Sequence, residues 1–389
     1  MGMRVILSSI VSVCLVVGMI APVGLAAEKQ PNLAKEASSA IVIERDTGQV
    51  LFEKNSDEKL PPASMTKIMT LLLIMEAIDS GKITYDDMVR TSENAASMGG
   101  SQVFLEPGEE MSVRDMIKAI AIASGNDASV AMAEHLAGTE EEFVGMMNEK
   151  ARQLGLKNTN FVNTNGLPEK DHYTSAYDLA MISKELLKYE DITEFTSVYE
   201  DYLRKGTDKE FWLVNTNRLV KFYPGVDGLK TGFTKEAKYC LTATAVKNGM
   251  RVITVVMGAP TPKERNSQIT EMLDFAFSQY QTHQVYERDT YMMDLNVRKG
   301  NKKSVPIFTS ESVSLVTKKG ESIDNVTERV EWKESLLAPV HKGDVVGTLY
   351  LERDGEILSE TPLIAGEDVA SASFWQMFKR IVGKFGGTS

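Results

Sequence analysis

The sequence predicts an α+β domain followed by a small all-β domain. Three observations lead to this prediction. The chain has 389 residues, which is too long for one ordinary hydrophobic core. Between residues 33 and 281, helical patterns stand between strand-like runs, so strands from both ends of this segment must complete one sheet. From residue 284 to 368 the pattern changes to short alternating runs separated by turns, which is typical of a β-sandwich.

Strand-like runs at both ends of the first domain form its predicted antiparallel sheet. Residues 40–44 and 50–53 flank the turn residues Asp46, Thr47 and Gly48, which predicts a hairpin. Late in the domain, β-rich runs separated by turn signals lie at residues 228–233, 240–246 and 251–256. We expect consecutive antiparallel strands there, completing the sheet that the hairpin begins.

A helical subdomain is predicted from apolar residues that recur at helical spacing between these strands. The predicted helices cover residues 65–78, 113–123, 128–136, 140–154 and 176–188, and a last helix at 263–280 closes the domain. The strands of the second domain are predicted at residues 291–297, 305–308, 313–317, 326–332, 345–351 and 357–364. Nothing in these later runs indicates catalysis.

Both chain ends carry segments outside these domains. Residues 1–26 begin with Arg4, continue with an apolar run and end in small residues, which is the layout of a signal peptide; an uncleaved membrane anchor is the alternative. In residues 371–389, apolar residues fall on one face of a helix and Lys and Arg lie elsewhere, as in helices that lie flat on an anionic membrane surface. The alternative is a terminal helix docked on its own domain. We expect an exported protein, held peripherally at the extracytoplasmic face of the cell membrane.

Composition and residue spacing exclude some partners. The formal net charge is -11 and no long basic cluster occurs, which argues against nucleic acid. The histidines are scattered without metal-ligand spacing, so neither a metal nor another cofactor is predicted. Cys240 is the one cysteine that follows the predicted signal peptide, so no intrachain disulfide is expected. A lone cysteine in a β run is usually a small core residue.

The segment Ser64-Met65-Thr66-Lys67 stands at the start of the first long helix, directly after two prolines. A serine at a helix N-terminus has unpaired backbone N–H groups around it, which favour a developing oxyanion. Lys67 lies three positions on, and therefore on the same face as Ser64. A lysine whose pKa is lowered by burial and nearby cations is able to take the serine proton. Alone this pattern is weak, because a serine before a helix is more often an N-cap.

A second motif, Ser124-Gly125-Asn126, lies at the corner between two helical runs. A glycine-containing turn at this corner presents the Ser124 and Asn126 side chains to a cleft. The alternative is a plain helix–helix turn in which Asp127 caps the second helix, and the motif taken singly favours that alternative.

A third motif, Lys230-Thr231-Gly232, lies on a predicted strand. A cation is unexpected there unless it faces a ligand, and glycine lets a substrate backbone approach the strand closely. The three motifs, in the order Ser-x-x-Lys, Ser-x-Asn and Lys-Thr-Gly, form the set found in penicillin-binding proteins and class A β-lactamases. Their conjunction is far more specific than any one of them.

The motifs and the phrases around them resemble the low-molecular-mass, serine-type D-alanyl-D-alanine carboxypeptidases of the penicillin-binding protein 5-like family. The likeness extends from about residue 40 through the β-domain to the amphipathic C-terminal helix. The matching phrases cover residues 62–67, 124–128, 175–179 and 228–232. The resemblance implies the penicillin-binding/β-lactamase-like fold for the first domain.

The resemblance also implies roles for residues of the first two motifs. Ser64 is the nucleophile that becomes acylated, and Lys67 is the base that deprotonates it. Ser124 relays a proton to the leaving D-alanine, and Asn126 holds the substrate amide and Lys67.

Further implied roles concern substrate binding. Lys230 and Thr231 grip the terminal carboxylate of the substrate, and Arg265 helps them. The backbone N–H groups of Ser64 and Phe233 form the oxyanion hole. The family often has histidine directly after Lys-Thr-Gly, whereas this chain has Phe233, so we expect a changed pocket wall rather than lost activity.

The implied reaction is removal of the terminal D-alanine from peptidoglycan stem peptides ending in D-Ala-D-Ala, with β-lactams as inhibitors that acylate Ser64. Three alternatives share the fold. A β-lactamase needs a water-activating glutamate in a Glu-x-x-Leu-Asn phrase, which the sequence lacks. A DD-transpeptidase differs only in the acceptor of the acyl group, and a non-catalytic sensor would have lost Ser64, Lys67 or Lys230. His172 and Asp178, on a predicted loop near the cleft, are expected to be structural.

Overall fold

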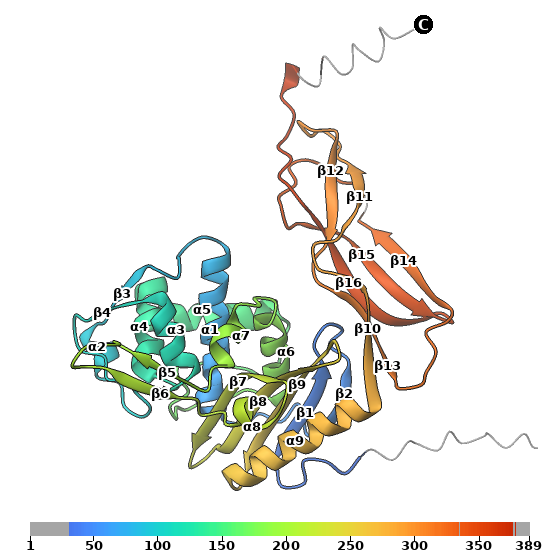
Figure 1. Cartoon of the computed structure of the whole chain (residues 1–389). Coiled ribbons are helices and arrows are strands. Elements are labelled where there is room, and N and C mark those ends of the chain that lie inside the picture. The colour runs from blue at the N-terminus through green and yellow to red at the C-terminus, as the bar shows by residue number, and fades with distance from the viewer. Residues whose placement is uncertain (1–30, 334, 376–377, 379–389) are drawn as a thin grey trace, which may run out of the picture. The chain divides into compact units, whose positions relative to one another are not determined.

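The computed structural model describes residues 31–333, 335–375 and 378 (Figure 1). The predicted signal peptide at residues 1–26 lies outside the described residues, as does most of the predicted C-terminal helix at 371–389. No helix in the described part of the chain is both long and apolar enough to cross a membrane.

A five-stranded antiparallel sheet, in the order β2-β1-β9-β8-β7, forms the centre of the first domain (Figure 1). Its strands are β1 (Ser39–Glu44), β2 (Val50–Lys54), β7 (Val226–Thr234), β8 (Lys238–Lys247) and β9 (Met250–Ala259). β1 pairs with β9, with Ile41 opposite Val255, so the N-terminal hairpin joins the three late strands. The predicted completion of the sheet is therefore confirmed.

Both faces of this sheet are buried, because its side chains alternate between two apolar cores. On β1, Ile41 and Ile43 belong to the core shared with the helical subdomain, whereas Val42 belongs to the core shared with α9 (Pro262–Gln279). α9 packs against β8 and β9 on one face, and α6 (Ala176–Leu186) packs against β1 and β9 on the other. The strand that carries Lys230, β7, pairs with β8 at one edge of this sheet.

The helical subdomain is built around α1 (Lys67–Asp79), which is buried over most of its length. An apolar helix without a polar face is expected at the centre of a domain. A 3₁₀ turn, η1 (Ala63–Thr66), leads directly into it. The other long helices, which lie where helical spacing predicted them, are α3 (Val113–Ala121), α4 (Asn126–Ala137), α5 (Glu140–Gln153) and α6.

The sequence patterns did not predict the shortest elements of this domain. These are α2 (Glu93–Ala96), α7 (Ile192–Thr196), α8 (Leu219–Phe222), and the strand pairs β3 (Met88–Arg90) with β4 (Glu110–Ser112) and β5 (Glu200–Leu203) with β6 (Phe211–Val214). Each has three to five residues, which is too few for a periodic pattern to stand out.

The C-terminal domain is all-β, as predicted. One sheet has the order β11-β12-β16-β15-β14, and β10 pairs with β13. The strands are β10 (Tyr280–Tyr286), β11 (Tyr291–Asn296), β12 (Ser304–Thr309), β13 (Val313–Lys318), β14 (Val326–Trp332), β15 (Val345–Arg353) and β16 (Glu356–Ala365). β10 was not predicted, because it follows α9 directly and its polar sequence lacks alternation.

Candidate active site

Ser64 lies in the η1 turn, at the N-terminal end of the central helix. Ala63 before it has a positive φ of 47°, which costs about 1–2 kcal/mol in a residue with a side chain, so the surroundings must hold this turn. Two glycines allow close support. A Cβ at Gly166 would lie 1.8 Å from the Ala63 carbonyl oxygen, and one at Gly232 would lie 2.7 Å from the Pro62 carbonyl oxygen. The Ser64 turn is thus held between the Gly166 loop and strand β7.

Lys67 is the first residue of α1, and its side chain is fully buried. Its Nζ atom lies 2.6 Å from Asn126 Oδ1, 2.7 Å from the Asn165 carbonyl oxygen and 3.3 Å from Ser64 Oγ. A neutral amine has two N–H donors and one lone pair. Because the two asparagine oxygens accept the two N–H bonds, the lone pair of a neutral Lys67 faces the Ser64 hydroxyl.

Burial and charge both favour the neutral form of Lys67. Desolvation is the largest cause that lowers its pKa well below the ordinary value of 10.5; the Lys230 cation lowers it further, and Asp127 opposes both. Lys230 is also buried, and desolvation together with the Arg265 cation lowers its pKa to about 7. The hydrogen-bond acceptors around the two Nζ atoms are neutral oxygens. Both lysines of the site therefore lose their protons more readily than a lysine in water does.

The Ser124 and Asn126 corner lies beside Lys67. Asn126 begins α4, and while its Oδ1 accepts from Lys67, its Nδ2 donates to the Gly99 carbonyl at 2.6 Å. Ser124 has a positive φ of 64°, and its buried Oγ has no hydrogen-bond partner among the described residues. Buried hydroxyl groups normally have partners, so the Ser124 hydroxyl retains hydrogen-bonding capacity for a ligand.

The alternative for this corner was a plain helix–helix turn in which Asp127 caps the second helix. Gly125 stands at the N-cap position of α4, and within the described part of the chain no side chain makes a cap hydrogen bond there. The Asp127 carboxylate instead accepts hydrogen bonds from the backbone N–H groups of Val103 at 3.0 Å, Leu105 at 3.1 Å and Ala128 at 2.9 Å. It thereby ties the loop between α2 and β4 to the helix that presents Asn126.

Strand β7 is an edge strand of the sheet and carries the third motif. Lys230 Nζ donates to the Thr231 carbonyl at 3.1 Å, and Thr231 Oγ1 donates to Thr216 Oγ1 at 2.7 Å. Arg265, in the first turn of α9, is close enough to Lys230 to lower its pKa. This end of the strand therefore combines two cations and a hydroxyl, which suit a carboxylate.

Phe233 follows the motif on β7 and makes an apolar wall. Its ring stacks on Tyr239 with the ring centroids 4.4 Å apart, and its side chain is 53% exposed. Cys240, opposite Gly232 on β8, is fully buried, and burial raises the pKa of its thiol to about 11. The thiol is thus a core group without the properties of a nucleophile.

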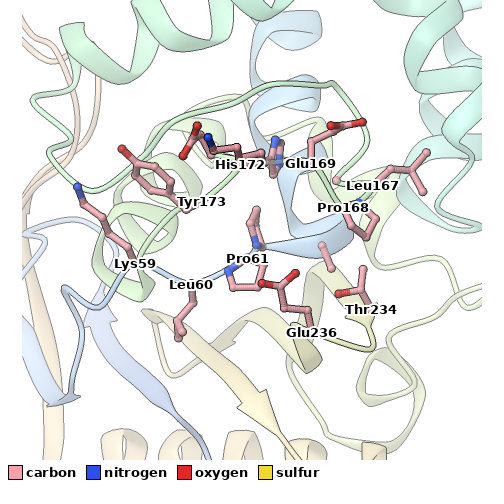
Figure 2. A pocket seen from close by; sticks show the side chains of 15 residues that line it. Lys59, Leu60, Pro61, Leu167, Pro168, Glu169, His172, Tyr173, Thr234 and Glu236 are labelled. Carbon is pink, nitrogen blue, oxygen red and sulfur yellow. The ribbon is translucent and has the colours of Figure 1, made fainter.

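A pocket of about 560 Å³ opens beside the Ser64 turn (Figure 2). The loop at residues 166–173 forms one wall, and the segment at residues 59–63 forms another. Thr234, the last residue of β7, and Glu236, in the turn after it, line the pocket as well. Because Ala63 and Thr234 both border it, the pocket lies between the Ser64 turn and the end of β7.

Some residues of the site carry no motif that sequence reasoning could use. Asn165 accepts the Lys67 hydrogen bond with its backbone carbonyl, which any residue type could supply. Thr216 lies 15 residues before Thr231, and only the folded chain brings their hydroxyl groups into contact. His172 was expected to be structural, and the structure places it under the Ser64 turn, 2.8 Å from Thr66 Oγ1. Asp178 lies in the first turn of α6 rather than on a loop, and its carboxylate holds the backbone N–H of residue 158 and the Thr159 hydroxyl.

Taken together, the geometry suits acyl transfer to a serine. The nucleophile has a buried amine 3.3 Å away, a free hydroxyl on the corner beside that amine, and a cationic strand edge that can orient a carboxylate.

Two family models match the chain. The family described as "D-alanyl-D-alanine carboxypeptidase" matches residues 25–261, which is more than half of the chain. The chain belongs to the serine-type D-alanyl-D-alanine carboxypeptidases. The family described as "Penicillin-binding protein 5, C-terminal domain" matches residues 280–371 of this carboxypeptidase.

Relatives of this carboxypeptidase cover almost its whole length. It is 62% identical over 356 residues to the D-alanyl-D-alanine carboxypeptidase DacF of Bacillus subtilis, with 92% of each chain covered. It is 33% identical over 347 residues to DacA of Escherichia coli, covering 87% of this chain and 85% of that one.

Solved structures agree with this assignment. Penicillin binding protein 5 from Haemophilus influenzae superposes with a TM-score of 0.69 at 32% identity, covering 88% of this chain and all of that one. Penicillin-binding protein D2 from Listeria monocytogenes, in its ampicillin-bound form, superposes with a TM-score of 0.57 at 33% identity, covering 64% of this chain and all of that one.

Proposed function

We propose that this carboxypeptidase removes the terminal D-alanine from peptidoglycan stem peptides that end in D-Ala-D-Ala, through an acyl-enzyme on Ser64. The observation that carries the proposal is the burial of Lys67 beside Ser64 Oγ, with Asn126 and Asn165 accepting from its Nζ. This arrangement supplies a base for the serine without histidine or metal. The names of the relatives supply the substrate class.

In the first step, Ser64 Oγ attacks the carbonyl carbon of the penultimate D-alanine, and its proton passes to the Lys67 lone pair. Negative charge develops on the carbonyl oxygen, where the backbone N–H groups of Ser64 and Phe233 act as donors; losing one such donor typically costs about 3 kcal/mol in the transition state. The C–N bond then breaks. The proton returns from Lys67, through the free Ser124 hydroxyl, to the nitrogen of the leaving D-alanine.

The substrate is held by its terminal carboxylate. Lys230, Thr231 and Arg265 supply charge-assisted hydrogen bonds to that group, so the scissile bond is the last bond of the peptide. Residues of the stem before D-Ala-D-Ala run along β7 past Phe233, towards the pocket bordered by Thr234 (Figure 2). In the second step, water attacks the ester on Ser64 and releases the shortened peptide.

β-Lactams enter the same reaction at its first step. The strained amide takes the place of the D-Ala-D-Ala bond, Ser64 becomes acylated, and the acyl group leaves slowly. The ampicillin-bound form of the Listeria monocytogenes protein supports this part of the proposal.

The test follows released D-alanine after incubation of the purified protein with diacetyl-Lys-D-Ala-D-Ala, with labelled penicillin in parallel and Ser64→Ala as the control. Release and labelling that both disappear in the variant support the proposal. Labelling without release would instead indicate a strict transpeptidase or a sensor. Absence of both signals in the native protein would refute the assignment of the site.

Transpeptidation is a second candidate, because a DD-transpeptidase from Streptomyces K15 superposes with a TM-score of 0.59 at 27% identity. Transpeptidation needs an amine in place of water. Adding glycine or a D-amino acid to the assay measures the partition of the acyl group, and an excess of aminolysis product over hydrolysis would favour this candidate.

We also propose that the protein is exported and held at the outer face of the cell membrane by its C-terminal segment. Phe374, Trp375 and Phe378 support this, since they are 75%, 68% and 48% exposed and lie close together. Exposed aromatic clusters of this kind fit a membrane interface. The predicted signal peptide at residues 1–26 supplies the export step.

Deleting residues from Ser371 onward tests the membrane proposal. The truncated protein should leave the membrane fraction and keep its activity on a soluble peptide. If the truncated protein were retained on vesicles containing anionic lipid as well as the full chain, the segment would not be the anchor.

A further inference from the structure

His172 lies beneath the Ser64 turn and lines the pocket beside it (Figure 2). The ring is almost fully buried and contacts two polar groups. Its Nδ1 atom lies 3.0 Å from the backbone nitrogen of Val162, and its Nε2 atom lies 2.8 Å from Thr66 Oγ1. Thr66 Oγ1 in turn lies 2.9 Å from the carbonyl oxygen of Ala63.

The directions of these hydrogen bonds follow from chemistry. A backbone N–H only donates, so Nδ1 of His172 must accept from Val162. The neutral ring then carries its proton on Nε2, which donates to Thr66 Oγ1. The Thr66 hydroxyl donates its own hydrogen bond to the Ala63 carbonyl. Each donor and acceptor in this chain of four groups is used, and burial, which lowers the pKa of His172 to about 4, keeps the ring neutral.

The last group of this chain is the strained one. Ala63 has a positive φ, its carbonyl faces the Cα of Gly166, and Ser64 follows it directly. A strained conformation persists only where several contacts determine it. The hydrogen bond from Thr66 fixes the Ala63 carbonyl from one side, and His172 fixes the rotamer of Thr66, which is itself fully buried.

We propose that His172 is a positioning residue for acylation: acting through Thr66, it holds the Ala63–Ser64 turn in the conformation that presents Ser64 Oγ to Lys67. The inference rests on the proposed function, since acylation of Ser64 is its readout. His172 acts through its contacts with Thr66 and Val162 rather than on Ser64 directly, and it transfers no proton during the reaction.

The experiment uses two substitutions that each keep one half of the histidine contacts. In His172→Gln the amide N–H reaches the place of Nε2 and preserves the bond to Thr66. In His172→Asn the amide oxygen reaches the place of Nδ1 and preserves the bond to Val162, but the bond to Thr66 is lost. We expect His172→Asn to slow acylation by labelled penicillin roughly tenfold, with His172→Gln close to the native rate.

Separating the acylation rate constant from the prior binding constant sharpens the result. Displacement of Ser64 should lower the acylation rate constant and leave the binding constant unchanged. Thr66→Val should slow acylation as His172→Asn does, and the double variant should be no slower than the slower single variant, because both changes break the same chain. Additive effects, or equal acylation by His172→Asn and His172→Gln, would overturn the proposal.

Asn148→Ala is the matched control for packing. Asn148 holds both backbone groups of Phe161 at 2.8 Å, beside Val162, but does not contact Thr66. This variant should lower Tm and leave the acylation rate unchanged. If His172→Asn fails to fold, Thr66→Val carries the test alone. Native protein without penicillin labelling would refute the proposed function, whereas native protein and His172→Asn labelled at equal rates would refute only the role of His172.

Discussion

Basic side chains have different surroundings in the C-terminal domain and in the active site. On β14 of the C-terminal domain, Arg329 is exposed, donates to Glu352 at 2.7 Å and lies over the Tyr350 ring. Hydrogen bonds to carboxylates raise the pKa of Arg329. In the active site, Lys67 and Lys230 are buried among neutral acceptors, and desolvation lowers their pKa values.

The burial of Lys67 and Lys230 without carboxylate partners lowers the stability of the folded protein. Burying an amine without a carboxylate partner is unfavourable for the charged form, so it destabilises the folded protein unless the group becomes neutral. A neutral amine beside a serine is a base, which an exposed and paired cation such as Arg329 can never be. Burial of the Lys67 amine therefore lowers the stability of the folded protein, and the same burial keeps the amine neutral and able to act as a base.

The sharpest test exchanges the two kinds of cation for apolar side chains. Lys67→Met removes the base, and we expect acylation by labelled penicillin to fall roughly 10³-fold. Arg329→Met should leave acylation unchanged, because its partners Glu331, Glu352 and Tyr350 all belong to the C-terminal domain. Equal activity of the two variants would break the comparison, and thermal unfolding of both shows that each has folded.

A second test compares two glycines with positive φ, one in each domain. Gly166→Ala drives a Cβ to 1.8 Å from the Ala63 carbonyl, so we expect it to lower the free energy of unfolding by about 3 kcal/mol or more and to abolish acylation. Gly343 has a φ of 90° and open space around it, so Gly343→Ala should cost about 1 kcal/mol. Denaturant titration measures the free energy of unfolding of both variants. A smaller loss of stability in Gly166→Ala would mean that the Ser64 turn shifts to make room for the added Cβ atom.

A third test uses the buried His172, whose pKa falls from 6.5 to about 4 on folding. Between these two pH values the unfolded chain binds a proton that the native ring does not, so stability falls as pH is lowered from 6.5 to 4, by up to about 3 kcal/mol. His172→Gln should remove this part of the pH dependence, as measured by denaturant titrations across that range. Thr66→Val keeps the titrating ring and should keep the steep dependence.

The smallest expected effect concerns Lys230 as a neighbour of Lys67. Lys67 works only when neutral, so acylation is lost as pH falls through its pKa. Lys230→Gln removes a nearby cation and raises the pKa of Lys67, so the acid limb of the acylation rate should move to higher pH, with roughly tenfold slower acylation at the optimum. Lys235→Gln, at the exposed turn after β7, is the matched control. If the acid limb of the pH profile did not move in Lys230→Gln, desolvation alone would lower the pKa of Lys67.

Much of the fold followed from residue patterns. Each strand of the first sheet and each long helix has enough residues for its period to be visible, and strands at both ends of the domain predicted that the N-terminal hairpin and the late strands share one sheet. α7 and α8 did not, because four or five residues carry no period. β10 was missed because tertiary pairing with β13, rather than alternation, makes it a strand.

The sequence by itself determined the reactive groups and their local frame. Ser64 and Lys67 share a helical face because they are three residues apart, and the motif at Lys230 lies on a strand because its neighbours favour one. These relations are local, so a short stretch of chain specifies them.

Only the tertiary structure decided how those groups behave. The acceptor from Asn165 is a backbone carbonyl, which every residue type has, and the contact of His172 with Thr66 joins residues 106 positions apart. The burial that lowers the pKa of Lys67 comes from layers that pack together only when the whole domain is folded. Desolvation is a property of the surroundings and not of the lysine. The motif therefore identifies the base, and the fold keeps it neutral.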